Sequence, residues 1–360
     1  MVSELYVATS LRRPNLANAP SGVALIPSEG ADTSRDGLFR VTLDGANPGS
    51  DTEYLGFGAS GGIRTPVVVD NENADIVYCA TNRAGVFRSK DHGATWTEVN
   101  DGIIFKEIWS LAQHPRTGEL YAGTGPGSVF KSSDRGDSWQ ECDGLNALKS
   151  RKSWTFPGPP FTAHVKGIGL HAADPSQVWG AIEVGWIIRS LDGGQTWENL
   201  RHGESHDSHF VLPMPDNPDI VVSTAGNGVF RSEDGGGSFI EVTQGLERKH
   251  MVDLVVHPDR PNVLFSAATK GSPRGWKDVP MGADSWVYRS EDQGKSWERL
   301  TQGLPDPMTP GVRAICGDRD DPDVVMVGFA NGTVWGTFDG GKTFELVVEG
   351  LPPVSGLTIS

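Results

Sequence analysis

The chain has 360 residues, with 46 glycines, 24 prolines and 3 cysteines, and its formal net charge at pH 7 is −15. This acidic charge argues against nucleic acid or an anionic membrane surface as a partner, and no segment has the length of a membrane-spanning helix. The cysteines, Cys79, Cys142 and Cys316, are odd in number and far apart, which favours buried free thiols over a disulfide framework.

The N-terminal region predicts short strands near residues 4–9, 37–43 and 52–57, and it lacks the basic start and apolar run of a signal peptide. We therefore expect a cytoplasmic protein, with a trimmed leader as the open alternative. The rest of the chain repeats one unit six times. Each unit has two strands joined by a turn that often contains His-Pro or Asp-Pro, a third strand, a glycine-containing turn and a fourth strand.

The glycine-containing turn has the pattern S/T-x-D-x-G-x-S/T-W/F. Its Asp can accept hydrogen bonds from nearby backbone amides, and its Gly can adopt the positive φ of a tight turn. The six copies span residues 89–96, 132–139, 190–197, 232–239, 290–297 and 337–344. We assign a structural role to their aspartates, which are Asp91, Asp134, Asp192, Asp234, Asp292 and Asp339.

These copies resemble the Asp-box, or BNR, repeat of sialidases, two-propeller xyloglucan-active glycoside hydrolases, sorting-receptor propellers and photosystem assembly factors. The resemblance implies a β-propeller in which each box joins the third and fourth strands of a blade, on the face away from the active site. The catalytic set of the sialidases is not matched. Arg64 lies in a sequence similar to their arginine strand and Arg313 is a possible second arginine, but a third arginine and a Tyr–Glu pair are not evident.

The C-terminal segment, residues 354–360, resembles an isolated first strand that would complete the first blade and close the ring. The sequence therefore predicts an all-β fold, a single seven-bladed β-propeller domain over residues 1–360 with four-stranded blades. The predicted blades are residues 354–360 with 1–58, then 62–102, 106–142, 164–201, 207–244, 250–301 and 311–349.

Three long inserts, residues 10–35, 143–162 and 270–284, interrupt the repeats. In an up-and-down blade, all three fall in loops that open on the face opposite the boxes. Long loops on a rigid scaffold commonly carry function, so we expect the functional site on that face.

The first strand of each blade should line the central channel, so residues at the starts of these strands converge at its mouth. Imidazole and carboxylate groups that converge from separate strands can hold a divalent metal ion such as Zn, Fe, Mn or Ca. The alternative is a solvated polar mouth without an ion. The candidate ligands at or beside this position are Glu107, His164, His206, Asp207, His209 and His250.

Glu183 ends the second strand of the fourth blade, where it could act as a general base or a further ligand, or form an ion pair with a neighbour such as Arg189. Lys270 is a second candidate catalytic residue, as a cationic contact. Aromatic walls and arginines in the inserts could bind a substrate. The candidate substrate-binding residues are Trp154, Phe156, Trp276, Arg12 and Arg64.

Together these features predict a metal-dependent hydrolase or lyase that acts on a small molecule at the channel mouth. The alternatives are a non-catalytic propeller that binds a glycan or a protein, and a divergent glycoside hydrolase. No P-loop is present, so no nucleotide cofactor is expected.

Overall fold

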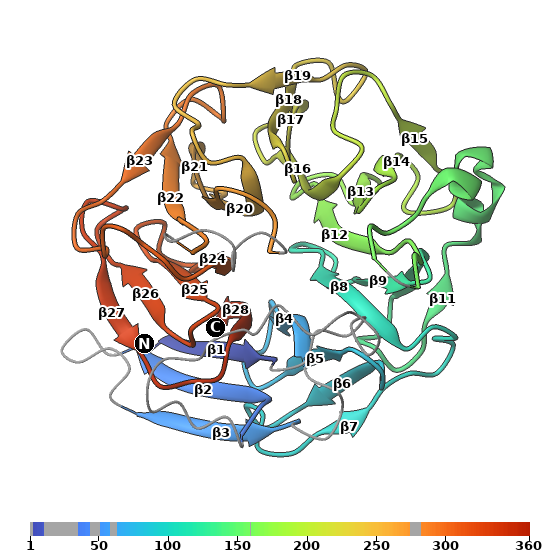
Figure 1. Ribbon diagram of the computed structural model, residues 1–360. Helices are drawn as coiled ribbons and strands as arrows, with labels where there is room; N and C mark the ends of the chain where they lie inside the picture. Colours follow the sequence, from blue (N-terminus) through green and yellow to red (C-terminus); the bar gives the residue numbers. More distant parts are fainter. Residues whose placement is uncertain (1–2, 11–34, 44–50, 58–62, 159, 274–281) are drawn as a thin grey trace.

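The computed structural model describes residues 3–10, 35–43, 51–57, 63–158, 160–273 and 282–360, and of residues 63–66 only the backbone. These residues form seven four-stranded antiparallel sheets arranged as blades around a channel (Figure 1). This arrangement confirms the predicted all-β seven-bladed propeller. None of the helices in the described ranges has the length and hydropathy of a membrane span.

Each blade runs from an innermost strand beside the channel to an outermost strand at the rim. In that order, the first blade contains β28 (Val354–Ile359), β1 (Ser3–Thr9), β2 (Leu38–Leu43) and β3 (Thr52–Gly56). The second contains β4 (Ile63–Val69), β5 (Val77–Thr81), β6 (Val86–Ser89) and β7 (Thr97–Glu98). The third contains β8 (Glu107–Gln113), β9 (Leu120–Gly125), β10 (Val129–Ser132) and β11 (Gln140–Glu141).

The fourth blade contains β12 (Val165–Leu170), β13 (Val178–Ile182), β14 (Trp186–Ser190) and β15 (Glu198–Leu200). The fifth contains β16 (Ser208–Met214), β17 (Asn217–Ala225), β18 (Gly228–Ser232) and β19 (Ile240–Val242). The sixth contains β20 (His250–His257), β21 (Arg260–Thr269), β22 (Trp286–Ser290) and β23 (Glu298–Leu300). The seventh contains β24 (Val312–Gly317), β25 (Val325–Phe329), β26 (Val334–Thr337) and β27 (Glu345–Val348).

Pairing of the two ends of the chain closes the ring. The C-terminal strand β28 pairs antiparallel with β1, with Leu5 opposite Ile359 and Val7 opposite Leu357. Just beyond this ladder, the Ser360 N–H donates to the Glu4 carbonyl oxygen at 2.9 Å. The first blade therefore combines both ends of the chain, as predicted, and the pairing of β28 with β1 closes the ring.

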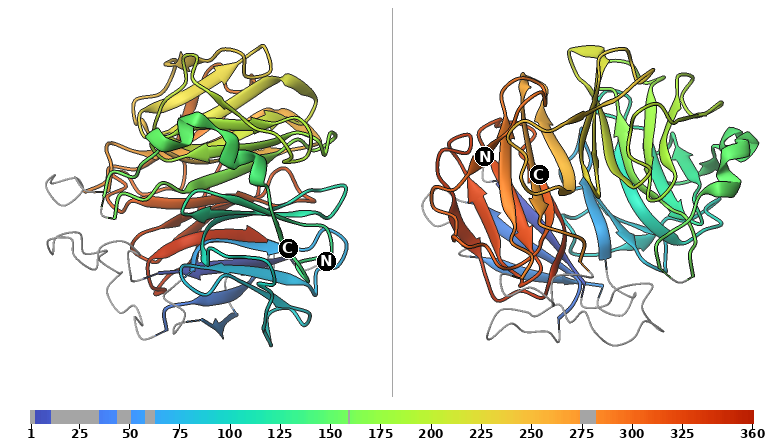
Figure 2. Two further views of the ribbon diagram at one scale, coloured as in Figure 1. Left: turned by 90° about the vertical axis from the view of Figure 1, so that its right-hand side faces the viewer. Right: turned by 45° about the horizontal axis from the view of Figure 1, so that its top comes forward.

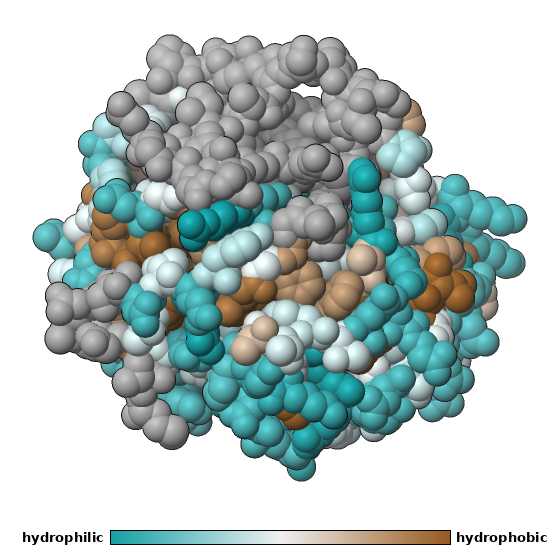
Figure 3. All heavy atoms as spheres, turned by 90° about the horizontal axis from the view of Figure 1, so that it is seen from below, coloured by the Kyte–Doolittle hydropathy of each residue, from teal (hydrophilic) through white to brown (hydrophobic). Residues whose placement is uncertain are grey.

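The outermost strands are short, and two of them are entirely polar. β7 and β11 have two residues each, and Thr97 and Glu98 of β7 are both exposed. Seen from the edge over the first two blades, hydrophilic side chains cover much of the described surface, and hydrophobic ones gather in a band across its middle (Figure 3). Short, polar outer strands offer little template for pairing with another chain.

The six glycine-containing turns, which we call box turns, share one hydrogen-bond pattern. In the copy at residues 190–197, the Ser190 hydroxyl donates to Asp192 Oδ1 at 2.8 Å and accepts from the Gly194 N–H at 2.8 Å. The Asp192 carboxylate also accepts from the backbone N–H and the hydroxyl of Thr196, at 2.8 and 2.6 Å. The same contacts recur around Asp91, Asp134, Asp234, Asp292 and Asp339.

Glycine in a box turn serves both the turn and the packing between blades. Gly236 has a φ of +90°, and a Cβ atom there would lie 2.7 Å from the ring of Trp179 in the preceding blade. Trp179 is fully buried. A larger residue at this position would be strained by its backbone and would also push the two blades apart.

The box turns lie on the same face as the turns between the first and second strands. The N–H of Gly193 donates to the carbonyl of Ser176 at 2.8 Å, and that of Gly235 to Asp219 at 2.8 Å. The starts of the innermost strands are at the other end of the channel. Those starts are therefore on the face opposite the box turns, as the blade topology predicts.

Histidines in the first turns of three blades bind the backbone of their own turns, and two of them also connect neighbouring blades. Nδ1 of His114, His171 and His257 accepts backbone N–H groups of its own turn. In addition, His114 Nε2 lies 3.1 Å from the His171 carbonyl oxygen in the next blade. His257 Nε2 likewise lies 2.7 Å from the Arg319 carbonyl oxygen in the blade that follows it. These contacts need a neutral ring whose proton is on Nε2, so these histidines have structural roles.

The insert between the third and fourth blades lies largely outside the channel mouth. It contains the 3₁₀ helices η2 (Asp143–Ala147) and η3 (Lys149–Ser153), which lie at the outer edge of the disc (Figures 1 and 2). Leu145 is fully buried in the core of the fourth blade. Burial of this side chain holds the insert against the edge, whereas the sequence predicted that it would cover the face.

Acid is expected to destabilise the propeller through its box turns. Hydrogen bonds from Thr196 lower the pKa of Asp192 to about 2, and those from Thr95 and Ser138 lower the pKa of Asp91 and Asp134 to about 2. A carboxyl with a folded-state pKa below its unfolded value of about 4 stabilises the fold above pH 4. The urea midpoint should therefore fall as the pH drops from about 4 to about 2.

An Asp192→Asn variant is the control for this titration. It should cost about 1 kcal/mol at neutral pH, because the carboxylate is exposed and its interactions are screened, and its urea midpoint should depend less on pH. An unchanged midpoint of the native protein between pH 4 and pH 2 would contradict the prediction.

Candidate functional site

Polar residues begin four consecutive innermost strands at the channel mouth. Glu107 and His250 are the first residues of β8 and β20, and His164 and Asp207 immediately precede β12 and β16. These four residues therefore occupy equivalent places in four neighbouring blades, as their alignment in the sequence predicted. Whether their side chains meet depends on the direction in which each side chain points.

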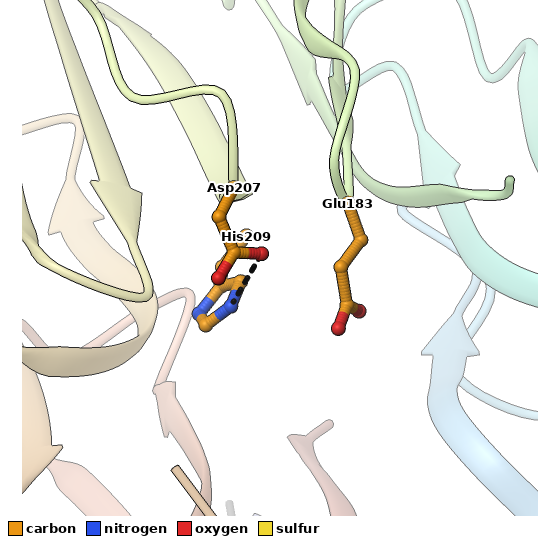
Figure 4. Close-up of side chains that lie close together, drawn as sticks. All are labelled: Glu183, Asp207 and His209. Carbon is orange, nitrogen blue, oxygen red and sulfur yellow. Dashed lines mark ion pairs between the residues drawn. The ribbon is translucent and has the colours of Figure 1, made fainter. Parts of the chain in front are cut away.

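Three side chains come together at this mouth: Glu183, Asp207 and His209. One ligand atom from each lies within 4.8 Å of the others, which is a spacing that could hold a metal ion. Glu183 follows β13, Asp207 precedes β16, and His209 is the second residue of β16. Glu183 extends from the fourth blade toward the space in front of the other two side chains (Figure 4). We call these three residues the mouth cluster.

His209 presents its Nε2 atom to the mouth cluster. The side chain is buried, and its Nδ1 lies 2.7 Å from the Met251 carbonyl oxygen, so Nδ1 carries the proton. Its Nε2 is 3.7 Å from Asp207 Oδ1. Neither of these two buried atoms has a hydrogen-bond partner among the described residues. Buried polar atoms without partners are costly, so the pair favours a bound ion or water at this place.

Glu183 is held in its ionised form. His164 Nε2 and Lys166 Nζ lie 3.0 and 3.2 Å from the same oxygen, Oε2. Burial alone would raise the pKa of Glu183, but the Lys166 ammonium and the hydrogen bond from His164 outweigh it and hold the pKa well below its usual range. In the described part of the chain no hydrogen bond to Oε1 is found, so this oxygen is available to an ion.

The predicted alternative for Glu183 was an ion pair with Arg189. Arg189 instead binds Glu198, with Nη2 2.6 Å from Oε1. The ion-pair partner of Glu183 is Lys166, which the sequence analysis did not single out. Lys166 follows His164 by two residues on a strand, so both side chains point to the same side, and this spacing is the signal that could have identified it.

Asp207 is also ionised. Burial raises its pKa, but the neighbouring His209 and Lys166 side chains outweigh burial and bring the pKa below its ordinary value. The mouth cluster and the adjacent Lys166 therefore combine two carboxylates and one ammonium group. A divalent cation would leave a net positive charge there.

His164 lies beside the mouth cluster and orients Glu183. It is fully buried, its ring stacks on Trp109 at a centroid distance of 3.2 Å, and Phe156 lies 5.0 Å away. The stacking fixes the imidazole plane, so the hydrogen bond to Glu183 has a defined direction. Trp109 had no predicted role.

The other candidate ligands lie outside the mouth cluster. His250 packs edge-on against His209 at 4.9 Å, and burial lowers the pKa of His250 to about 3, so its ring is neutral. His206 is exposed, and its carbonyl oxygen accepts the Gly185 N–H. Glu107 is half-buried at the start of β8. Metal binding by these residues stays a prediction.

The candidate catalytic and substrate-binding residues outside the mouth cluster are dispersed. Trp154 is buried, and its Nε1 donates to Asn199 Oδ1 at 3.3 Å. Phe156 packs on Trp109 and His164, and Lys270 is exposed. The remaining candidates are outside the described residues or side chains, namely Arg12, Trp276 and the Arg64 side chain.

The chain matches no family model, and no curated protein matches it in sequence. Among solved structures it is similar to the GH74 enzyme of Niastella koreensis, with 17% identity and a TM-score of 0.62 over 80% of this chain and 45% of that one. It is similar to the GH74 xyloglucanase from Xanthomonas campestris, with 16% identity and a TM-score of 0.60 over 80% and 46%.

A third similar structure is YCF48 bound to D1 peptide, with 16% identity and a TM-score of 0.52 over 79% of this chain and 82% of that one. At these identities the likeness shows the propeller fold alone. The chain spans less than half the length of the two GH74 structures and about four-fifths of the length of YCF48.

Proposed function

We propose that the protein is a metal-dependent enzyme, a hydrolase or lyase of a small molecule, with a divalent ion held by Glu183, Asp207 and His209. The observation that carries this proposal is the mouth cluster, in which ligand atoms within 4.8 Å of one another include two buried atoms without hydrogen-bond partners among the described residues. The site lies at the channel mouth, opposite the box turns, which we infer to be Asp-boxes.

The residues fit a transition metal. Two carboxylates and a neutral imidazole suit Zn, Mn or Fe(II), whereas Ca²⁺ takes six to eight oxygen ligands and fits less well. Three protein ligands leave coordination positions open for water or substrate. The bound ion would lower the pKa of a water molecule or polarise a substrate oxygen.

The surrounding residues have separate roles in this proposal. Glu183 would bind through Oε1, while His164 and Lys166 hold Oε2. A carboxylate whose pKa is well below its usual range is a weak proton acceptor, so Glu183 fits the role of a ligand better than that of a general base. The Lys166 ammonium can stabilise negative charge that develops on the substrate.

A divergent glycoside hydrolase is less well supported. Such enzymes usually need one protonated carboxyl group, and their two carboxyl groups lie about 5 Å or more apart. In this protein Glu183 and Asp207 come within 4.8 Å, and both pKa values lie below their ordinary values. This pair therefore has no general acid for the leaving group.

Peptide binding is a second candidate. It rests on the similarity to YCF48 bound to D1 peptide, a structure of which the chain covers 82%, against 45% of a GH74 enzyme. A single propeller of this size can bind a partner without catalysis. This candidate would gain support if no metal ion bound the mouth cluster.

Metal loading tests the proposal directly. Protein treated with a chelator should take up one ion per chain from Zn²⁺, Mn²⁺ or Fe²⁺, measured by elemental analysis. At a free-ion concentration 100 times Kd, the ion should stabilise the fold by about 2.7 kcal/mol, seen as a higher melting temperature. A protein that retains no ion after gentle purification, and whose melting curve no added ion changes, would rule the metal site out.

A further inference from the structure

A cavity of about 410 Å³ lies at the other end of the channel, on the face of the box turns. Strands β16, β20 and β24 form its walls, with largely apolar side chains that include Phe210, Leu212, Val256 and Ile315. None of the mouth-cluster residues lines it. Its volume is within the range of small-molecule sites.

Asp253 of β20 lines this cavity. Its neighbours Met251 and Leu254 pack into a core shared with the fifth blade, and Val252 and Val255 pack into the core shared with the seventh. These contacts leave Asp253 on the channel side of the strand. No described residue donates a hydrogen bond to its carboxylate. Removal from water raises the pKa of Asp253, and this effect is larger than the lowering of the pKa by the nearby Lys166 and His209. Asp253 is half-buried, and a carboxylate that lines an apolar cavity without a hydrogen-bond donor favours a cationic partner.

The positive side chains around the cavity are already paired. Arg260 Nη1 lies 2.6 Å from Asp323 Oδ1, and Arg319 Nε lies 3.7 Å from Asp320 Oδ1. The first turns of the blades, which surround this end of the channel, contain far more acidic than basic residues, so their field favours cations. The acidic residues are Asp70, Glu72, Asp75, Glu119, Asp174, Asp216, Asp219, Asp259, Asp318, Asp320, Asp321 and Asp323.

We propose that this cavity binds an organic ammonium ion with an apolar body, with the ammonium group paired to Asp253. The apolar walls would cover the body of the ligand, and Phe210 offers an aromatic surface to a cation. No mouth-cluster residue lines this cavity, although the charges of Lys166 and His209 reach Asp253.

Hexylammonium and 1-hexanol are the probes that test the site, because they share an apolar chain and differ in charge. Cys316 lines the cavity and is partly exposed, whereas Cys79 and Cys142 are buried. The rate at which a thiol reagent modifies Cys316 therefore reports occupancy. Hexylammonium should slow this reaction at concentrations about tenfold lower than those that 1-hexanol requires, because only its ammonium group can pair with the Asp253 carboxylate.

Asp253→Asn should raise the half-protecting concentration of hexylammonium about tenfold and leave that of 1-hexanol unchanged. The matched control is Asp259→Asn, an exposed acid on the same face that does not line the cavity, and it should change either value less than twofold. Equal protection by the two probes in the native protein would overturn the proposal. So would equal effects of the two substitutions, which would show a diffuse surface field.

Discussion

His209→Ala is expected to lower the affinity of the protein for its divalent ion by at least about 100-fold. The substitution removes the buried Nε2, the one nitrogen ligand that the mouth cluster offers. Loss of a ligand should cost more than loss of an outer partner, for which about 10–100-fold is usual. Isothermal titration with Zn²⁺ and with Mn²⁺ measures the change, and any hydrolytic or lyase activity that needs the metal should fall with it.

His206→Ala is the matched control, because His206 is exposed, adjacent to Asp207 and outside the mouth cluster. Its metal affinity should stay within about twofold of the native value. His164→Ala should fall between the two, at about 10–100-fold, since it removes the hydrogen bond and the stacked ring that orient Glu183 but no ligand atom. Equal losses in the His206 and His209 variants, or none in either, would show that the ion does not bind at the mouth cluster.

Truncation after residue 353 is expected to prevent cooperative folding. It removes β28 and with it Val354, Leu357 and Ile359, which are buried in the core between the first and seventh blades. Each buried aliphatic side chain contributes about 1.5–3 kcal/mol, and the backbone ladder to β1 is lost as well. The total is comparable with the whole stability of a typical domain, about 5–15 kcal/mol.

Urea denaturation followed by circular dichroism and tryptophan fluorescence measures the effect of the truncation. Ser360→Gly is the control, because it keeps the strand and removes only the hydroxyl that accepts the Glu4 N–H; its midpoint should change little. A truncated chain that unfolds in one transition at the native midpoint would mean that β28 does not hold the ring closed.

The fold could be predicted from the sequence because its defining contacts are local. The hydrogen bonds around Asp192 join residues at most four positions apart, so each copy of the turn pattern specifies its own structure. The six copies of the turn identified six blades, and residues 354–360 were recognised as the innermost strand of the remaining blade, which also contains the N-terminal strands. The position of Asp207 and its neighbour His209 also followed from the repeat length.

The composition of the mouth cluster could not be predicted in the same way, because it depends on how side chains from neighbouring blades are oriented. His164 and Asp207 occupy equivalent places, yet stacking on Trp109 commits His164 to Glu183, while Asp207 faces His209. The cavity beside Asp253 likewise depends on how the sixth and seventh blades pack. The sequence by itself determined the blades and the face that carries the site, since short-range turn chemistry sets both. Only the tertiary structure decided which side chains meet, because those contacts join residues distant in the chain.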